Sequence, residues 1–262
     1  RLDYNFDCKS QIMHRFYVPD IDTSGQVITL KGSIARQIKN VLRIEAGERV
    51  RLFNGAGDEW EAEISTVGKN EISTTLISTV KTIPEPSTKI TMILGLARPE
   101  RIELAIQKCS ELGAVKFIPV ISERVQGGNS GTPSLQRLKR WERIAIESAE
   151  LSGRAIIPSI AQPISLMEAV NQAQIKQNVL CMWEESTDES KSLKAALKSL
   201  EKHPDGLTVL IGPPGGLSQK EALSIQSTGA QLVNLGPRVL RSETAAITVM
   251  SAILYEMGDL DG

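Results

Sequence analysis

The chain changes its pattern at residues 84–89, and this change constrains the fold more than any other feature. Before this segment, short runs of alternating apolar and polar residues predict β-strands. After it, apolar runs alternate with stretches of helical period. Pro84 and Pro86 lack an amide hydrogen, so the segment itself cannot continue a strand ladder. The sequence therefore predicts two domains, residues 13–83 and residues 90–262, joined by a linker at 84–89.

The two parts predict different fold classes. The first has several short strands and one helical stretch, residues 33–42, which is typical of a small β-barrel. The second alternates strands and helices, which predicts an α/β domain with a largely parallel sheet. Its last helix, residues 242–257, is apolar nearly all round and is expected to be buried. Ser165 and Ser218 each precede a glutamate by three positions, so we predict that both serines form capping boxes.

Composition disfavours several classes of protein. Hydrophobic residues make up 41% of the chain, yet no apolar run approaches the roughly 20 residues that span a bilayer. The first residues lack the apolar stretch of a secretion signal, so we expect a cytoplasmic protein. Cys8, Cys109 and Cys181 are too far apart for a zinc knuckle, and we expect reduced thiols. With only His14 and His203 present, we expect neither a metal site nor a Ser-His-Asp triad.

Two glycine-containing loops follow predicted strands of the second part. Residues 212–217 (GPPGGL) lie between an apolar strand and Ser218, and residues 236–241 (GPRVLR) follow the next strand. Parallel sheets bind ligands at the carboxyl ends of their strands, and glycine lets a ligand approach backbone amides. The spacing matches neither the ATP-binding phosphate loop nor the dinucleotide fingerprint. The sequence therefore predicts one crevice, formed by both loops, for a small ligand other than ATP or NAD.

The net charge of −1 conceals a local excess of basic residues. Between Lys31 and Arg51 the chain has six basic and two acidic residues, and six minus two gives a local charge of +4. A solvated face and a nucleic-acid-binding surface are both compatible with this excess.

Five motifs, taken together, resemble one family of RNA-modifying enzymes. They are Asn40–Arg43 (NVLR), Gln107–Gly113 (QKCSELG), Ser122–Arg124 (SER), Ile211–Ser218 (IGPPGGLS) and Leu235–Ala246 (LGPRVLRSETAA). Over residues 13–258, in this order, they resemble the bacterial small-subunit (16S) ribosomal RNA N3-uridine methyltransferases of the SPOUT superfamily. The resemblance implies an N-terminal PUA-like RNA-binding barrel and a C-terminal α/β domain with a trefoil knot. It also implies a homodimer that uses S-adenosyl-L-methionine and acts on ribosomal RNA, which we expect to be within the assembled small subunit.

The resemblance also indicates which residues form the site. We expect the cofactor to contact Trp183, Glu184, Ile211, Gly212, Pro213, Gly215, Gly216, Leu235, Gly236, Val239, Leu240 and Ser242. Uracil N3 carries a proton, so charge spreads to the carbonyl oxygens as that proton leaves, and a guanidinium stabilises such charge. Arg241 is our first candidate for this catalytic role and Arg238 the second. A salt bridge to Glu243 or Glu111 is the competing interpretation of both arginines.

Contacts with RNA phosphates are expected from both domains. The candidates are Arg15, Arg36, Lys39 and Arg43 in the first domain, and Arg98 and Arg124 near the crevice. Lys39 and Arg43 are four residues apart and are expected on one helix face. Aromatic residues make up only 4% of the chain, which leaves Phe16, Tyr17 and Phe53 as candidates for base stacking. We therefore expect recognition of shape and phosphates to dominate.

Two positions depart from the family pattern, and three alternatives stay open. Pro214 stands where the family usually has glutamate, which removes a carboxylate and an amide hydrogen. Ser242 stands where the family usually has threonine, and we expect it to act as an N-cap. The alternatives are a SPOUT enzyme acting on transfer RNA or ribose, a non-catalytic RNA-binding ribosome assembly factor, and a phosphate-binding enzyme of the sugar-nucleotide kind. Affinity for the cofactor separates an enzyme from an assembly factor.

Overall fold

The computed structural model describes residues 13–124, 133–174, 178–185, 191–200 and 206–260. Cys8 and His203, for which we made predictions, lie outside the described residues. The chain divides into two compact units. One comprises Arg1–Ile83 together with Gly153–Ile156, and the other comprises Pro84–Ser152 together with Ile157–Gly262. The linker at 84–89 has no helix or strand, and Ser87 donates its backbone N–H to Asp259 Oδ1 at 2.8 Å within the second unit.

The first unit contains a five-stranded sheet with the order β1-β3-β4-β5-β2. The strands are β1 (Arg15–Tyr17), β2 (Val27–Lys31), β3 (Arg49–Phe53), β4 (Glu59–Val67) and β5 (Glu71–Thr79). β1 and β3 are parallel, and the remaining pairs are antiparallel. The β4–β5 register shifts at Glu61/Ala62 and at Ile64/Thr66, and such irregularities bend a sheet. Alternate side chains, including Val50, Leu52 and Ile72, form the core of this predicted barrel.

The helical stretch of the first unit differs from the continuous helix predicted for residues 33–42. A short helix α1 (Gly32–Arg36) leads directly into a π-helix, η1 (Gln37–Leu42). Arg43 ends η1 in the left-handed conformation, with φ 55° and ψ 39°. The prediction that Lys39 and Arg43 share a helix face was therefore wrong, because Arg43 lies beyond the helix. The buried side chain of Ile38 and its carbonyl, which accepts from Ile44 N–H at 3.0 Å, fix the wide turn.

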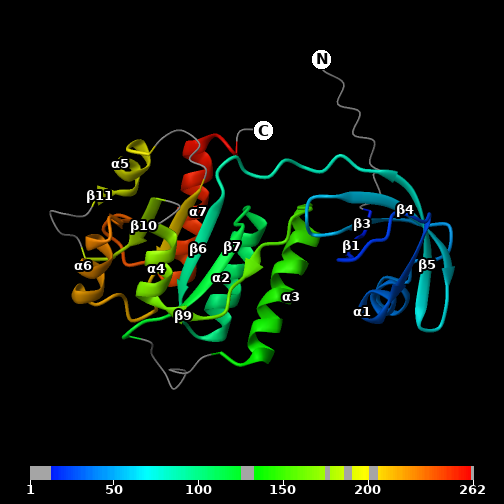
Figure 1. Ribbon diagram of the computed structural model, residues 1–262, viewed down its shortest axis with the longest axis horizontal. Coiled ribbons are helices and arrows are strands. Elements are labelled where there is room, and N and C mark those ends of the chain that lie inside the picture. Colours follow the sequence, from blue (N-terminus) through cyan, green and yellow to red (C-terminus); the bar gives the residue numbers. More distant parts are fainter. Residues whose placement is uncertain (1–12, 125–132, 175–177, 186–190, 201–205, 261–262) are drawn as a thin grey trace, which may run out of the picture. The chain divides into compact units, whose positions relative to one another are not determined.

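The second unit contains one parallel sheet in the order β11-β13-β10-β12-β6-β7-β8, and β9 also pairs with β7 (Figure 1). Its strands are β6 (Ile90–Gly95), β7 (Lys116–Ile121), β8 (Ser159–Ile160), β9 (Ile164–Ser165), β10 (Asn178–Met182), β11 (Lys191–Ser192), β12 (Leu207–Ile211) and β13 (Gln231–Asn234). Its helices are α2 (Pro99–Glu111), α3 (Leu135–Ser152), α4 (Leu166–Gln174), α5 (Leu193–Lys198), α6 (Gln219–Ser227) and α7 (Ser242–Met257). The alternation predicted from the sequence is confirmed.

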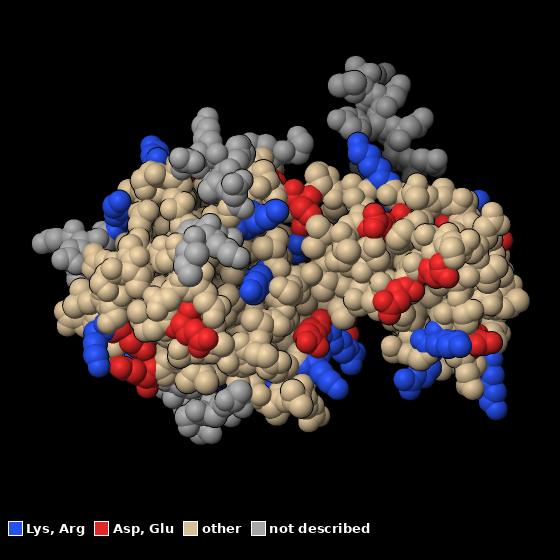
Figure 2. Space-filling view, viewed as in Figure 1, with Lys and Arg blue, Asp and Glu red and all other residues tan. Residues whose placement is uncertain are grey.

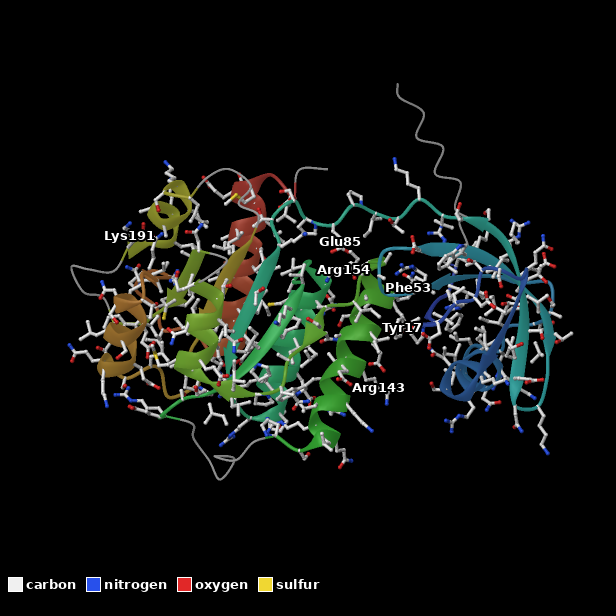
Figure 3. All side chains as sticks on the ribbon, viewed as in Figure 1. Tyr17, Phe53, Glu85, Arg143, Arg154 and Lys191 are labelled. Atoms are coloured by element: carbon white, nitrogen blue, oxygen red, sulfur yellow. The ribbon has the colours of Figure 1, made fainter. Side chains whose placement is uncertain are left out.

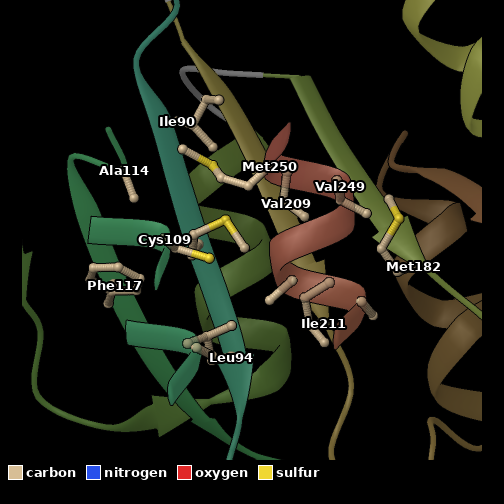
Figure 4. Close-up of a cluster of buried hydrophobic side chains, with 14 of the residues drawn as sticks. Ile90, Leu94, Cys109, Ala114, Phe117, Met182, Val209, Ile211, Val249 and Met250 are labelled. Atoms are coloured by element: carbon tan, nitrogen blue, oxygen red, sulfur yellow. The ribbon is translucent and has the colours of Figure 1, made fainter. Parts of the chain in front are cut away.

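Helices cover both faces of this sheet, which explains why its central strands are apolar throughout. α2, α3, α5 and α7 pack on one face, with Met92 and Phe117 of the sheet. Figure 4 shows Phe117 in this cluster with Cys109 of α2 and Val249 of α7. α4 and α6 pack on the other, with Ile93 and Leu210. Successive residues of a strand point to opposite faces, so a strand that is buried on both sides loses the alternation of polar and apolar residues. No described helix is both long enough and apolar enough to cross a membrane.

The strand order places the last strand inside the sheet. β13 lies between β10 and β11, although both of these strands precede it in the chain. The chain then returns to α7, on the face opposite α6. This strand order is compatible with the trefoil knot that the family resemblance implies. The carboxyl ends of β10, β12 and β13 lie together, since these three parallel strands are neighbours in the sheet.

Both described cysteines are buried free thiols. Cys109 lies on α2 and Cys181 on β10, each in an apolar cluster. Burial raises the pKa of the Cys109 thiol to about 12, and burial likewise raises the pKa of Cys181. The thiolate is the reactive form, so at pH 8 neither thiol ionises appreciably. We expect neither cysteine to react with a maleimide in the native protein and both to react after unfolding, as measured by peptide mass spectrometry. Rapid native labelling of Cys109 would contradict this packing.

Candidate cofactor site

A cavity of about 210 Å³ lies at the carboxyl ends of β10, β12 and β13. Most of the residues predicted to bind the cofactor line it: Trp183, Glu184, Ile211, Gly212, Pro213, Gly216, Leu235, Gly236, Val239, Leu240 and Ser242. Both predicted catalytic arginines, Arg238 and Arg241, line it as well. The structure therefore brings together three loops that are widely separated in the sequence.

The lining of the cavity differs from the prediction at five positions. Gly215 does not line the cavity, whereas Pro214 does. The prediction missed Arg101, Met182 and Ala245, which also line it. Arg101 comes from α2, which follows β6, the strand beside β12. Only the order of strands in the sheet puts α2 next to the glycine loop, and that order is not visible in the sequence.

The loop after β12 approaches its neighbours so closely that glycine is required at two positions. Gly216 has φ +70°, and a Cβ there would overlap the Glu184 carboxylate. A Cβ on Gly95, at the end of β6, would overlap the backbone nitrogen of Pro213. Positive φ and close backbone approach are the two situations that favour glycine. These contacts fix the loop at 212–216 against the ends of β6 and β10.

Pro214 fits the turn that it occupies. Gly216 N–H donates to the Pro213 carbonyl at 2.9 Å, which closes a four-residue turn with Pro214 as its second residue. Proline is favoured at this position because its φ is preset and its missing amide hydrogen is not part of the turn's hydrogen bond. The next helix is held by a reciprocal capping box between Ser218 and Glu221, as predicted, with bonds of 2.8 and 3.1 Å. The backbone of the loop is therefore well determined without a glutamate at position 214.

The loop after β13 ends at α7, where the structure corrects one prediction. Arg241, not Ser242, is the N-cap, and Ser242 is the first residue of the helix. The Ser242 hydroxyl instead donates to Glu243 Oε2 at 3.2 Å. A serine one position inside the helix cannot reach the amides that an N-cap side chain would accept from. At Ser165, by contrast, the hydroxyl accepts from Glu168 N–H at 3.3 Å, half of the predicted capping box.

The ion pairs at the site leave two arginines available. Glu243 pairs with Arg101 at 4.0 Å, and the Glu243 side chain is largely buried at the start of α7. Lys108 holds Glu111 at 2.8 Å. In the part of the chain that the structure describes, no carboxylate forms an ion pair with Arg238 or Arg241, and both side chains are exposed. The competing interpretation of these arginines as partners of Glu243 or Glu111 is therefore not supported by the geometry.

The cavity combines three chemical features. Leu235, Leu240 and Ile211 supply an apolar surface, and the glycines of the two loops expose their backbone amides and carbonyls. Glu184 supplies a carboxylate, and the arginines supply positive charge. An apolar slot with a few polar groups is typical of a site for a small molecule.

Arg15, which we predicted to contact RNA, instead binds groups of its own unit. Its guanidinium donates to both oxygens of Glu59, at 3.0 and 2.8 Å, and to the Arg154 carbonyl at 3.1 Å. The side chain is 10% exposed and lies over the Phe53 ring, 4.7 Å from the centroid. An arginine that is buried in a bidentate pair stabilises the barrel and cannot reach a phosphate. Arg15 is therefore corrected to a structural residue of the first unit, which holds the segment 153–156.

The remaining predicted RNA contacts are on the surface. Arg36, Lys39 and Arg43 are exposed in the first unit, and Arg98 and Arg124 are exposed in the second. Arg98 is the N-cap of α2, directly after β6, and Arg124 donates weakly to the Leu217 carbonyl at 3.5 Å. Both arginines of the second unit therefore lie on loops at the edge of the sheet that carries the cavity.

The aromatic candidates for base stacking are mostly buried. Phe16 and Phe53 are 1% and 0% exposed, so neither can stack on a base. Tyr17 is partly exposed and packs against Phe53 with ring centroids 5.8 Å apart (Figure 3). Burial, with a smaller contribution from Asp20, raises the pKa of Tyr17. Two of the three predictions were wrong. Strand alternation turns Phe16 into the barrel core, whereas Phe53, which follows the core residue Leu52, is buried on the other face of β3 against Arg15 and Tyr17.

Comparisons with known proteins agree with this geometry. The family model of an RNA methyltransferase domain matches residues 84–254, and that of an RNA methyltransferase PUA domain matches residues 30–77. The chain is 30% identical to ribosomal RNA small subunit methyltransferase E of Bacillus subtilis (strain 168), over 89% of this chain and 92% of that protein.

Solved structures show the same fold. The crystal structure of a ribosomal RNA small subunit methyltransferase E from Neisseria gonorrhoeae, bound to S-adenosyl methionine, matches with a TM-score of 0.82 and 30% identity. A methyltransferase structure from Legionella pneumophila in complex with the cofactor SAM matches with a TM-score of 0.81 and 31% identity. Both cover 93% of this chain and 97% of the other chain. With a PUA-like barrel and a SPOUT-type α/β unit, this chain belongs to the ribosomal RNA small subunit methyltransferase E family.

Proposed function

We propose that this protein transfers a methyl group from S-adenosyl-L-methionine to N3 of a uridine in small-subunit ribosomal RNA. The observation that carries the proposal is the cavity at the ends of β10, β12 and β13, with its glycine backbone, its apolar surface and two exposed arginines. Two related structures hold the same cofactor. The sequence motifs that resemble N3-uridine methyltransferases support the choice of atom.

The residues of the cavity fit an adenosyl group. Leu235, Leu240 and Ile211 would flank the adenine, and the backbone of Gly212 and Gly236 would meet its polar edge. A carboxylate accepts hydrogen bonds from two ribose hydroxyls, and Glu184 is the carboxylate in the lining. The bound cofactor would supply a methyl group on a positively charged sulfur. The 210 Å³ cavity is lined by loops, so side chains at its mouth can adjust to the part of the cofactor beyond the adenosyl group.

Within this proposal, the arginines stabilise the uracil that accepts the methyl group. Loss of the N3 proton places negative charge on the two carbonyl oxygens, and a guanidinium can donate to either of them. Arg241 sits at the rim, next to the start of α7, where the helix dipole adds to its positive field. Arg238 is the second candidate. Methyl transfer requires an in-line approach of N3 to the methyl group. The position of the uracil and the exclusion of water from the cavity therefore account for the rest of the rate acceleration.

In this proposal the two units have different roles. Residues 13–83 bind RNA, residues 84–89 link the units, and residues 90–262 carry the cofactor and the catalytic arginines. Val239 at the mouth of the cavity is 82% exposed, and an apolar side chain exposed at this place supports a homodimer formed beside the site. The cytoplasm, where ribosomes assemble, is the compartment that this substrate requires.

The geometry at Pro214 argues against the non-catalytic alternative. Because proline fits its turn, we expect Pro214→Ala to change the dissociation constant for S-adenosyl-L-methionine by less than about threefold. The same variant should lower the free energy of unfolding by roughly 0.4 to 1 kcal/mol, since proline restricts the unfolded chain. Calorimetric titration and chemical denaturation measure the two effects. No detectable binding by the parent protein would instead favour an assembly factor that has lost transfer.

A further inference from the structure

The surface formed by α1, η1 and Arg43 has two uncommon backbone features. η1 is a π-helix, a form that is rare and often found at functional sites. Arg43 is the one non-glycine residue with positive φ in the described part of the chain. Such conformations are energetically unfavourable, and they cluster where a protein binds ligands. Both features fall on the exposed basic stretch of the first unit, on which Figure 2 shows Lys and Arg side chains.

A hollow of about 260 Å³ lies between this helical segment and the turn that joins β4 to β5. We call it the α1–turn hollow, and its polar lining comprises Arg36, Lys39, Asn40, Lys69 and Asn70. Lys39 Nζ donates to the Gly68 carbonyl at 2.9 Å, which ties the helical segment to the turn. The hollow is therefore a defined feature of the unit, although all five side chains are exposed.

The basic side chains of the α1–turn hollow have no acidic partner among the described residues. No carboxylate lines it, and within the described ranges none forms an ion pair with Arg36, Lys39 or Lys69. Glu71, next to Asn70 in the chain, contacts Lys31 instead, at 3.8 Å. Glu45 lines only the neighbouring hollow, which Lys39 also borders. Three like charges around one hollow repel each other, so an external anion would stabilise them.

The amides of the α1–turn hollow supply a different chemistry. Asn40 and Asn70 face it from opposite sides, one from η1 and one from the turn. Neither side chain has a hydrogen-bond partner among the residues that the structure describes. A carboxamide both donates and accepts, which matches the edges of nucleobases. The hollow therefore places cations, which bind phosphate, next to amides that can bind a base.

We propose that the α1–turn hollow binds one unpaired nucleotide of RNA, with its phosphate on Lys39, Lys69 and Arg36 and its base edge on Asn40 and Asn70. The inference rests on the proposed function only in taking RNA as the ligand. A volume of about 260 Å³ is of the size of a single nucleotide. Recognition of unstacked bases by hydrogen bonds to their edges is the usual way in which proteins read RNA sequence.

Lys69→Ala tests the phosphate half of the proposal, with Lys81→Ala as the matched control. Lys81 is an exposed lysine of the same unit, beyond the opposite end of β5. The probe is a fluorescent single-stranded RNA of roughly 12 nucleotides, within the range that a small barrel covers. We expect Lys69→Ala to weaken binding about fivefold and to lower the slope of log affinity against log salt by about 0.7. Lys81→Ala should leave both quantities within error, and equal effects of the two variants would overturn the proposal.

Asn70→Ala tests the base half. We expect it to leave the salt slope unchanged while it reduces the preference for single-stranded RNA over a duplex of the same length. Photocrosslinking with 4-thiouridine in the same RNA should label peptides that contain residues 32–40 or 68–70. Crosslinks confined to other peptides, or an unchanged preference, would overturn the proposal. Methyl transfer is measured separately. If the RNA-binding results contradict the role of the hollow, the proposed reaction still stands. If the protein binds RNA as expected but transfers no methyl group, the role of the hollow still stands.

Discussion

Arg241→Ala is expected to lower the rate of methyl transfer by roughly 100- to 1000-fold, the usual effect of removing a group that stabilises developing negative charge. Arg241 lines the cavity, is exposed, and has no ion-pair partner in the described part of the chain. Its removal should therefore cost little stability. The measurement is transfer of labelled methyl to small ribosomal subunits at saturating cofactor and substrate.

The control for Arg241→Ala removes an arginine of no proposed role. Arg143 on α3 is 78% exposed and pairs with Glu147 one turn away at 2.7 Å. An exposed pair of this kind contributes little to stability, so Arg143→Ala should transfer at the parent rate. Near-normal turnover by folded Arg241→Ala would remove Arg241 from the mechanism. In that case Arg238→Ala becomes the decisive variant, because Arg238 lines the same cavity.

Gly95→Ala is expected to weaken binding of S-adenosyl-L-methionine more than about tenfold, although residue 95 makes no contact with the cavity. A Cβ at this position would overlap the backbone nitrogen of Pro213 and lie 2.7 Å from the Gly212 carbonyl carbon. Backbone atoms cannot rotate away, so the loop at 212–216 has to move. The strain should also lower the free energy of unfolding by about 1–3 kcal/mol, as other overpacked sites do.

Calorimetry and thermal unfolding separate the two effects of Gly95→Ala. Gly25→Ala is the matched control, since nothing lies within 4 Å of its Cβ and its φ is not positive. It should match the parent protein in both cofactor affinity and stability. An unchanged cofactor affinity in Gly95→Ala would show that the position of the loop at 212–216 does not determine binding.

The sequence predicted the elements of this fold better than their arrangement. Helix α7 occupies the residues expected for it, 242–257, because hydrophobic period is a local property of the chain. The order of strands is set by packing of the whole unit, so the insertion of β13 between β10 and β11 was available only through family resemblance. The π-helix was also missed, since its wide turn depends on burial of Ile38.

The same contrast between local patterns and packing of the whole unit explains which residues of the site were predicted. Glycine loops after strands indicated most of the cavity, because the carboxyl ends of parallel strands meet at one edge. Arg101 was missed because it comes from a helix with no glycine motif, next to the site only through the pairing of β6 with β12. Arg15 was assigned to RNA because its charge was visible, while its partner Glu59 lies 44 residues away in the sequence. Charge patterns thus identify candidates, and burial decides among them.

The most direct test of the central claim is the identity of the methylated nucleoside. The protein is incubated with S-adenosyl-L-methionine carrying a labelled methyl group and with small ribosomal subunits that lack their native modification. The RNA is then digested to nucleosides and analysed by mass spectrometry. We predict N3-methyluridine at a single site, formed roughly 100- to 1000-fold more slowly by Arg241→Ala. A labelled nucleoside other than N3-methyluridine, or no transfer by a protein that binds the cofactor, would contradict it.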